Sequence, residues 1–166
     1  KRIRLGSLEP KVVTEEFAQE LSKLEKVCPH FHLSLQSGCD ATLQRMNRKY
    51  SAQEYKNGCD ILRKYFEHPA ITTDVIVGFP GESDELFMET YNFLKDVVRP
   101  AFIHIFPYSR RAGTPAAERK DQVQDCKKTL RVQMLEELSA QLHAEFIEAN
   151  KGVAEKVLFE STEKGG

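Results

Sequence analysis

The sequence predicts an α/β protein with parallel strands, and three observations favour this class. Short apolar segments alternate with helical patterns four times along the chain, with short connections between them. Residues 75–77 are apolar without a polar break, as in a strand that is covered on both faces. That strand leads through a glycine turn into a helix. Because four units are too few to close an eight-stranded barrel, we expect an open sheet or part of a barrel.

Composition limits the function classes. The chain has 166 residues, of which 40% are hydrophobic and 30% charged, so it can form one domain with a core and a soluble surface. No apolar run approaches membrane-spanning length, and residues 1–10 lack the apolar segment of a signal peptide. We therefore expect a cytoplasmic protein without a membrane partner. A net charge of -1 gives no electrostatic indication of nucleic-acid binding.

The four cysteines, Cys28, Cys39, Cys59 and Cys126, are irregularly spaced and include no CxxC pair. This spacing predicts neither a disulfide framework nor a metal site. Reduced, mostly structural thiols are expected instead.

The first unit begins with residues 2–8, where alternation predicts a strand that ends near Leu8. Glu9 follows at its carboxyl end, where ligands bind in barrels; the alternative is a solvated loop acid. Thr14 can cap the next helix. Its expected apolar face consists of Phe17, Leu21, Leu24 and Val27.

The second unit begins with residues 30–36, which alternate strictly between apolar and polar side chains. The polar side would face solvent in an open sheet and the lumen in a barrel. Residues 40–46 indicate a short helix, followed by the basic residues Arg45, Arg48 and Lys49. Ser51 and Glu54 form a capping-box pattern that opens a helix through Tyr65. The expected buried face of that helix is Tyr55, Cys59, Leu62 and Phe66.

The third unit is the one around which the others are organised. Residues 71–77 predict a strand that carries one acid, Asp74, and a buried carboxylate needs a partner. Gly78 and Gly81 can adopt positive φ in the following turn, and Ser83 opens a helix. This arrangement favours a ligand at the carboxyl end of the strand; a tight connection without a ligand is the alternative. The helix face is Phe87, Tyr91, Leu94 and Val98.

The fourth unit is a strand at residues 101–106, followed by a loop at 107–115 that contains Tyr108, Arg110 and Arg111. Paired arginines at a strand's carboxyl end suit an anionic substrate; an ordinary solvated loop is the alternative. A long helix is predicted over residues 121–150, and a new strand over 156–160. The helix's expected apolar face is Val123, Cys126, Leu130, Met134, Leu138, Leu142 and Phe146.

Five segments occur in an order that resembles the radical S-adenosylmethionine (SAM) methylthiotransferases almost end to end. They are RIRLGSLEP, HFHLSLQSG, RMNRKY, TDVIVGFPGE and FPYSRRAGTPAA. The segments ETYNF and FPYSRRAGTPAA resemble the branch that modifies N6-threonylcarbamoyladenosine in tRNA. They are less similar to the branches that modify isopentenyladenosine or a ribosomal protein.

The resemblance implies a six-stranded partial (β/α) barrel, of which this chain would hold strands three to six. Residues 1–118 would form the carboxyl-terminal part of that barrel, 119–152 a long connecting helix, and 153–166 the start of an RNA-binding TRAM domain. The family uses SAM and two iron–sulfur clusters, together with tRNA, a sulfur donor and a reductase. Because the family's CxxxCxxC spacing is absent here, we expect this chain alone to bind no cluster and to be inactive.

The resemblance also assigns the SAM-facing wall to Glu9, Gln36, Arg48, Asp74 and Gly78. Gln36 and Asp74 would hydrogen-bond ribose hydroxyls. Arg48, expected on the neighbouring helix, would pair with the methionine carboxylate, unless it belongs to a solvated basic cluster. Glu9 would accept from the ammonium or a hydroxyl group. Gly78 would allow the backbone to approach the adenine.

Weaker candidates for substrate binding are Tyr108, Arg110 and Arg111, with the arginines binding the threonylcarbamoyl carboxylate or a tRNA phosphate. Two other function classes remain open: a cluster-free α/β domain that binds a nucleotide, and a scaffold without a ligand. An open sheet edge and an exposed apolar face also predict that the chain self-associates.

Overall fold

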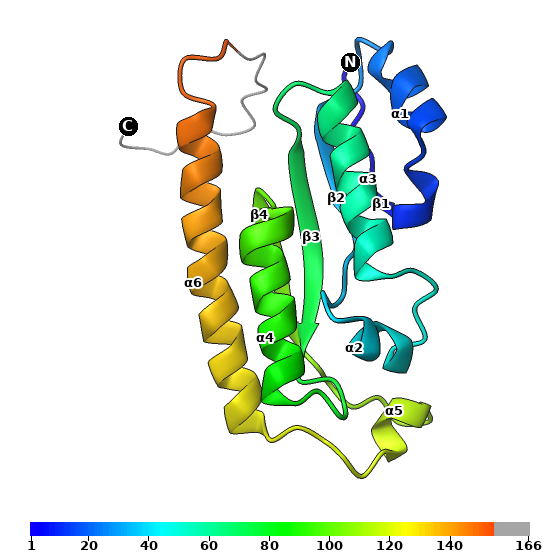
Figure 1. The fold of residues 1–166 in the computed structure, drawn as a ribbon, viewed down its shortest axis with the longest axis vertical. Helices are drawn as coiled ribbons and strands as arrows, with labels where there is room; N and C mark the ends of the chain where they lie inside the picture. The colour runs from blue at the N-terminus through cyan, green and yellow to red at the C-terminus, as the bar shows by residue number, and fades with distance from the viewer. Residues whose placement is uncertain (155–166) are drawn as a thin grey trace.

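The computed structural model describes residues 1–154. Its centre is a four-stranded parallel sheet in the order β1-β2-β3-β4 (Figure 1). The strands are β1 (Ser7–Leu8), β2 (His30–Leu33), β3 (Ala70–Val77) and β4 (Phe102–Pro107). The predicted α/β class and the parallel strand direction are therefore confirmed.

Helices occupy every connection between the strands, as the alternation in the sequence predicts. Figure 1 shows α3, α4 and α6 running along the strands, with α2 and α5 near the end of the molecule at which β3 terminates. The helical elements are η1 (Pro10–Val12), α1 (Glu15–Ser22), α2 (Asp40–Arg45), α3 (Ala52–Tyr65), α4 (Asp84–Asn92), the π-helix η2 (Phe93–Val98), α5 (Pro115–Glu118) and α6 (Asp125–Ala149).

The core lies between one face of the sheet and these helices. Alternate strand residues supply one side of it, because successive side chains of a strand point to opposite faces. Helices α3, α4 and α6 and the π-helix supply the other side. The fully or nearly fully buried members include Phe31, Leu33, Val75, Ile103, Tyr55, Leu62, Leu94, Leu135 and Leu138. The opposite face of the sheet carries polar and exposed residues and is described below.

Three predicted helix starts are confirmed by side-chain caps. Thr14 Oγ1 accepts from Phe17 N at 3.1 Å, and Ser83 Oγ accepts from Leu86 N at 3.3 Å. Ser51 and Glu54 form the complete reciprocal capping box of α3. These local signals require no tertiary contact, so the sequence predicts them well.

The first strand is shorter than predicted. Ile3 makes only an isolated parallel bridge to Val27, and the regular ladder is limited to two residues of β1. As the edge strand, β1 can form ladder bonds on one side alone. The prediction that Leu24 lies on the apolar face of the helix is wrong. Helix α1 ends at Ser22, and Leu24 is 56% exposed. The chain leaves the helix there to reach the bridge at Val27.

The buried face of α6 is rotated from the predicted one. Cys126 and Leu130 are exposed, whereas Arg131 and Leu135 are buried. The reason is electrostatic. Arg131 faces the core side of the helix because its guanidinium pairs there with the carboxylates of Glu82 and Asp84. Helix α6 also begins at Asp125 and not near residue 121. The predicted strand at 156–160 lies outside the described residues.

Candidate functional site

The open face of the sheet carries polar side chains together with the exposed aromatic ring of Phe106. A cavity of about 530 Å³ lies on it. All four strands or the segments next to them contribute to its lining: Arg4, Leu5, Gly6, Ser7, His30, His32, Asp74, His104 and Phe106. The alternation of residues 30–36 predicts polar side chains on this face, and His32 lies there, opposite the buried Phe31 and Leu33.

Asp74 has the partner that its position in an apolar strand requires. Its Oδ2 lies 3.1 Å from Nε2 of His32, and the other ring nitrogen of His32 lies 3.0 Å from Oγ1 of Thr72. His32 is therefore fixed from both ends of its ring. The Asp74 side chain keeps 26% of its surface exposed, toward the cavity. One carboxylate oxygen is thus held by His32 and the other can accept a hydrogen bond from a ligand.

Gln36 lies beside Asp74 at the carboxyl end of β2. Its backbone N–H donates to the Asp74 carbonyl at 2.8 Å, and its own carbonyl accepts from Ile76 N at 2.9 Å. Gln36 adopts a left-handed conformation with φ 67°, which is uncommon for a residue other than glycine. The structure therefore brings two of the predicted site residues together through the backbone of neighbouring strands.

Glu9 and Arg48 approach the same strand end around Tyr50. The Tyr50 hydroxyl donates to the carbonyls of Ser34 at 2.9 Å and Leu35 at 3.1 Å, the last residues before Gln36. Burial raises the pKa of Tyr50; the positive charge of Arg48 opposes this and the negative charge of Glu9 adds to it. Both charges are thus close to this hydroxyl.

The expected position of Arg48 on a helix is wrong. Arg48 lies in the turn after α2, where its backbone N–H donates to the Leu43 carbonyl at 2.9 Å. Helix α2 ends at Arg45, and Asn47 takes a left-handed conformation that cannot continue a helix. Arg48 and Glu9 are both exposed, so the turn presents the guanidinium to solvent beside the end of β2.

The glycine turn after β3 is fixed from the helix side. Glu82, which is buried, accepts from Gly78 N at 2.6 Å and from Arg131 of α6 at 2.7 Å. Arg131 also donates to Asp84 at 2.7 Å. A Cβ at Gly78, whose φ is +73°, would collide with the Lys128 side chain. The lack of a side chain at Gly78 is therefore already required for packing against α6.

Neither the Glu82–Arg131 pair nor the contribution of His104 was predicted from the sequence. An apolar period along α6 could not indicate that an arginine faces the core. His104 could have been predicted from the sequence, because it lies between the apolar residues Ile103 and Ile105 of its strand. In the structure its ring centroid lies 5.5 Å from that of His32. The alternation that predicts His32 on the open face of β2 also predicts His104 on the open face of β4.

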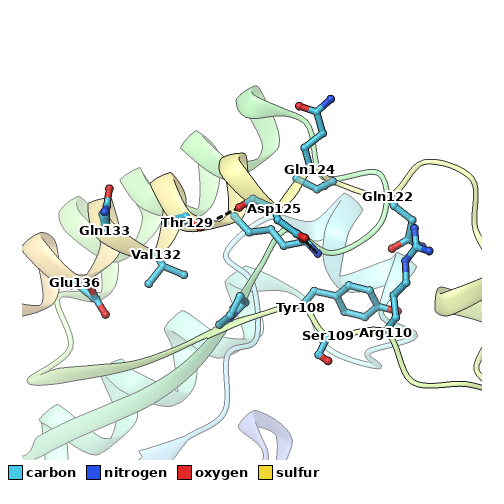
Figure 2. Close-up of a pocket in the computed structure, with 13 residues that line it drawn as sticks. Tyr108, Ser109, Arg110, Gln122, Gln124, Asp125, Thr129, Val132, Gln133 and Glu136 are labelled. Carbon is cyan, nitrogen blue, oxygen red and sulfur yellow. Dashed lines mark hydrogen bonds and ion pairs between the residues drawn. The ribbon is translucent and has the colours of Figure 1, made fainter.

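Tyr108, Arg110 and Arg111 follow β4 and do not line the open face. Tyr108 is half-buried, and both arginines are exposed. Tyr108 and Arg110 line a second cavity, between the end of β4 and the start of α6 (Figure 2). Arg111 lines neither cavity.

The cysteines do not form a cluster site in the part of the chain that the structure describes. Cys39 and Cys59 are buried, and burial raises the pKa of Cys39 and takes that of Cys59 to about 12. A thiol must lose its proton to bind iron, so burial of this kind opposes ligation. Within residues 1–154, no three His, Cys, Asp or Glu side chains gather in a way that could hold a metal ion.

Within residues 1–154, no helix is both long enough and apolar enough to cross a bilayer.

Curated relatives of the chain modify tRNA according to their names. The threonylcarbamoyladenosine tRNA methylthiotransferase of Bacillus subtilis is 45% identical over 146 residues, which are 88% of this chain and 32% of that protein. The tRNA-2-methylthio-N(6)-dimethylallyladenosine synthase of Symbiobacterium thermophilum is 39% identical over 165 residues, or 99% of this chain and 35% of that protein. The chain thus spans about a third of the length of the curated relatives that it matches.

Solved structures support the fold. Coproporphyrinogen III oxidase from Escherichia coli, a radical SAM enzyme, aligns with a TM-score of 0.69 at 17% identity over 85% of this chain and 32% of that chain. Elp3 from Methanocaldococcus infernus aligns with a TM-score of 0.62 at 18% identity over 76% of this chain and 30% of that chain. At these identities the likeness shows a shared fold.

A family model completes the comparison. The radical SAM superfamily model matches residues 2–94, which is more than half of the chain. This match includes β1, β2 and β3 and therefore Glu9, Gln36 and Asp74. Because the model covers more than half of the chain, the chain belongs to the radical SAM superfamily.

Proposed function

We propose that this chain is part of a tRNA methylthiotransferase that installs a methylthio group on C2 of N6-threonylcarbamoyladenosine. Support comes from the 45% identity to a relative named for that substrate and from the segments ETYNF and FPYSRRAGTPAA. Because the chain spans about a third of such relatives, the activity would belong to a longer protein.

The single observation that carries the proposal is that Gln36, just after β2, lies beside Asp74 of the neighbouring strand β3, whose side chain lines the cavity on the open face. Ligands of parallel α/β sheets bind at the carboxyl ends of strands. The free Asp74 oxygen would accept from a ribose hydroxyl of SAM, while His32 holds the carboxylate in place. The Gln36 amide would hydrogen-bond the second ribose hydroxyl, since an amide both donates and accepts.

Two charged residues near Tyr50 complete the proposed SAM wall. Arg48 would pair with the carboxylate of the methionine moiety through parallel N–H donors. Glu9 would accept from the ammonium group or a hydroxyl. Gly78 would contribute by shaping the turn, because its N–H already donates to Glu82. Bound SAM would supply the radical chemistry, and this chain's residues would bind and orient it.

The iron–sulfur clusters of the family would be held outside the described residues, whose cysteines do not suit them. We therefore propose that this chain alone is inactive. In the longer protein it would act in the cytoplasm with tRNA as substrate and would require a sulfur donor and a reductase as partners.

The second candidate substrate is dimethylallyl (isopentenyl) adenosine in tRNA. Relatives named for that substrate are 39% and 41% identical over 99% of the chain, a longer match than the 88% of the first relative. Both candidates share the chemistry and the SAM wall and differ in the base that is modified.

Mass spectrometry of tRNA nucleosides from a strain that lacks the encoding gene separates the two. We expect loss of the methylthio mark from threonylcarbamoyladenosine, with restoration by the intact gene and no restoration by a gene with Asp74→Asn. Loss of the mark from dimethylallyladenosine alone would show that the second candidate, and not threonylcarbamoyladenosine, is the substrate. An unchanged nucleoside profile would refute both.

A further inference from the structure

A second cavity lies on the helix side of the sheet, where β4 ends and α6 begins (Figure 2). Its volume is about 1030 Å³, and it shares no lining residue with the cavity on the open face. Figure 2 shows Tyr108, Arg110 and Gln122 gathered at one end, with Gln133 and Glu136 at the other end along α6. The first group contains the features that indicate a ligand.

Two buried polar atoms at that end have no hydrogen-bond partner within the described part of the chain. They are the hydroxyl of Tyr108 and the carbonyl oxygen Oε1 of Gln122. Buried polar groups in folded proteins are nearly always paired, because an unpaired one loses its hydrogen bonds to water without replacement. Two residues that line one cavity therefore each carry a polar atom without a partner in the described part of the chain, which indicates a ligand there.

Neither atom can find a partner by a simple rotation of its side chain. The Gln122 amide nitrogen donates to the carbonyls of Ala116 at 2.8 Å and Arg119 at 3.0 Å, so exchanging N and O would break both bonds. The Tyr108 ring packs against Phe79 with centroids 5.1 Å apart and lies 5.8 Å from the Lys128 ammonium. Both side chains are therefore held in place where they line the cavity.

The chemistry of these two atoms limits the ligand. Gln122 Oε1 can only accept, whereas the Tyr108 hydroxyl can donate or accept. A bare phosphate or carboxylate offers acceptors alone and would leave Gln122 unpaired. The edge of a nucleobase presents donors and acceptors side by side, and so satisfies both.

The exposed guanidinium of Arg110 lies at the same end of the cavity (Figure 2). Arginine binds phosphate in a bidentate manner. The other cation of the lining, Lys128, pairs with Asp125 at 3.1 Å, which leaves Arg110 as the better phosphate partner. A base edge and a phosphate together describe one nucleotide.

We propose that this cavity binds one nucleotide of the substrate RNA, apart from the base that is modified at the open face. Tyr108 and Gln122 would bind the base edge, and Arg110 the adjacent phosphate. The inference rests on the proposed function, because it takes tRNA as the substrate. It adds a second contact that would help to position the RNA strand.

The test measures the binding of unmodified tRNA to the intact protein by fluorescence anisotropy over a series of salt concentrations. Tyr108→Phe removes one neutral hydrogen bond, so affinity should fall about fivefold at every salt concentration. Arg110→Ala removes a phosphate contact, so the slope of log affinity against log salt should decrease by about one. Lys120→Ala, an exposed cation of the neighbouring loop that does not line the cavity, is the charge control and should change the slope less.

Thermal unfolding distinguishes binding from stability. Tyr108→Phe deletes a hydroxyl without a protein partner and should leave the melting temperature unchanged or raise it. Tyr50→Phe deletes a hydroxyl that donates to two carbonyls and should lower it.

The inference is overturned if Tyr108→Phe and Arg110→Ala bind tRNA with the affinity and salt slope of the unaltered protein. It is also overturned if Tyr108→Phe lowers stability as much as Tyr50→Phe does, since its hydroxyl would then have a partner in the fold. Failure of the proposed function would be seen separately, as an unchanged methylthio profile in cellular tRNA.

Discussion

At the scale of single residues, the contact between His32 and Asp74 decides how the open face can bind a ligand. Thr72 fixes one nitrogen of the imidazole and Asp74 accepts at the other, so the carboxylate is held in one orientation. A carboxylate that is oriented before binding loses less entropy when it accepts a ligand hydroxyl. The pair therefore has the geometry of a preorganised binding group.

Replacing Asp74 by asparagine tests this role. The amide keeps the shape but loses the negative charge, and hydrogen bonds to charged groups contribute about 1.5–3 kcal/mol. We expect the affinity of the intact protein for SAM to fall at least about tenfold in equilibrium dialysis. Asp96→Asn, an exposed acid of the π-helix, is the matched control. Equal SAM affinity in the two variants would remove Asp74 from the proposed site.

His30 predicts a dependence of stability on pH. Burial, then the charge of Arg4, and more weakly His32 and His104, lower the pKa of His30 from its ordinary 6.5. The folded chain therefore binds the His30 proton less tightly than the unfolded chain does. Stability should fall as the pH decreases from 6.5 toward the lowered pKa, because the unfolded state takes up more protons in that window.

Urea denaturation of the chain at a series of pH values measures this effect. His30→Gln should flatten the decline of unfolding free energy below pH 6.5, since glutamine does not titrate. His68→Asn is the control, because His68 is exposed and asparagine tolerates its left-handed backbone, φ 46°. A decline that is identical in all three proteins would show that His30 does not cause it.

At the scale of elements, the turn after β2 packs directly on the π-helix. A Cβ at Gly38 would lie 2.8 Å from Cδ1 and 2.9 Å from Cβ of Phe93. Gly38 also donates its N–H to Thr90 of α4 at 3.1 Å. The close approach of this turn to α4 and η2 fixes the position of Gln36, two residues earlier.

Gly38→Ala should therefore destabilise the chain by about 1–3 kcal/mol, as overpacking of a core does. Gly6→Ala is a matched control: nothing lies within 4 Å of a Cβ there, so we expect a change near zero. The measurement is the unfolding free energy in urea. A Gly38→Ala protein as stable as the Gly6→Ala protein would show that the turn can move away from Phe93.

Element packing also explains why Arg131 is buried. Its guanidinium joins Glu82 of the glycine turn to Asp84 of α4, and Glu82 in turn binds the Gly78 N–H. Breaking a buried pair by removing one partner leaves an uncompensated charge, which costs about 3–5 kcal/mol. Helix α6 thereby fixes the turn that follows β3, from the side opposite the open face.

At the scale of the whole molecule, the sheet of the described chain has two edges, β1 and β4. Phe102 and Phe106 of β4 are 40% and 50% exposed. Unpaired edges and exposed apolar side chains favour association with another strand.

We accordingly expect this chain, purified by itself, to self-associate, as light scattering during size-exclusion chromatography would detect. Phe102→Lys should shift the distribution toward monomer, because a charge on an edge strand opposes pairing. Met88→Lys, on the exposed side of α4, should leave it unchanged. A monodisperse monomer at every concentration would contradict this prediction.

Local patterns predicted the regular parts of this chain. The apolar run of β3, the caps at Thr14, Ser51 and Ser83, and the alternation of β2 each depend on residues close in sequence. The errors concern Leu24, the rotation of α6 and the position of Arg48. Each depends on a contact or backbone conformation that periodicity does not encode, such as the burial of Arg131 against Glu82.

The sequence by itself determined the α/β class, the parallel strand–helix order, the presence of Glu9 and Gln36 after strands and that of Asp74 within one, because periodicity and turn chemistry act over a few residues. Only the tertiary structure decided that His32 holds Asp74, that Glu82 and Arg131 fix the glycine turn, and that Tyr108 and Gln122 share a cavity. These pairs join residues 42, 49 and 14 positions apart. Their distances depend on sheet register and helix rotation, which are set by the packing of the whole chain.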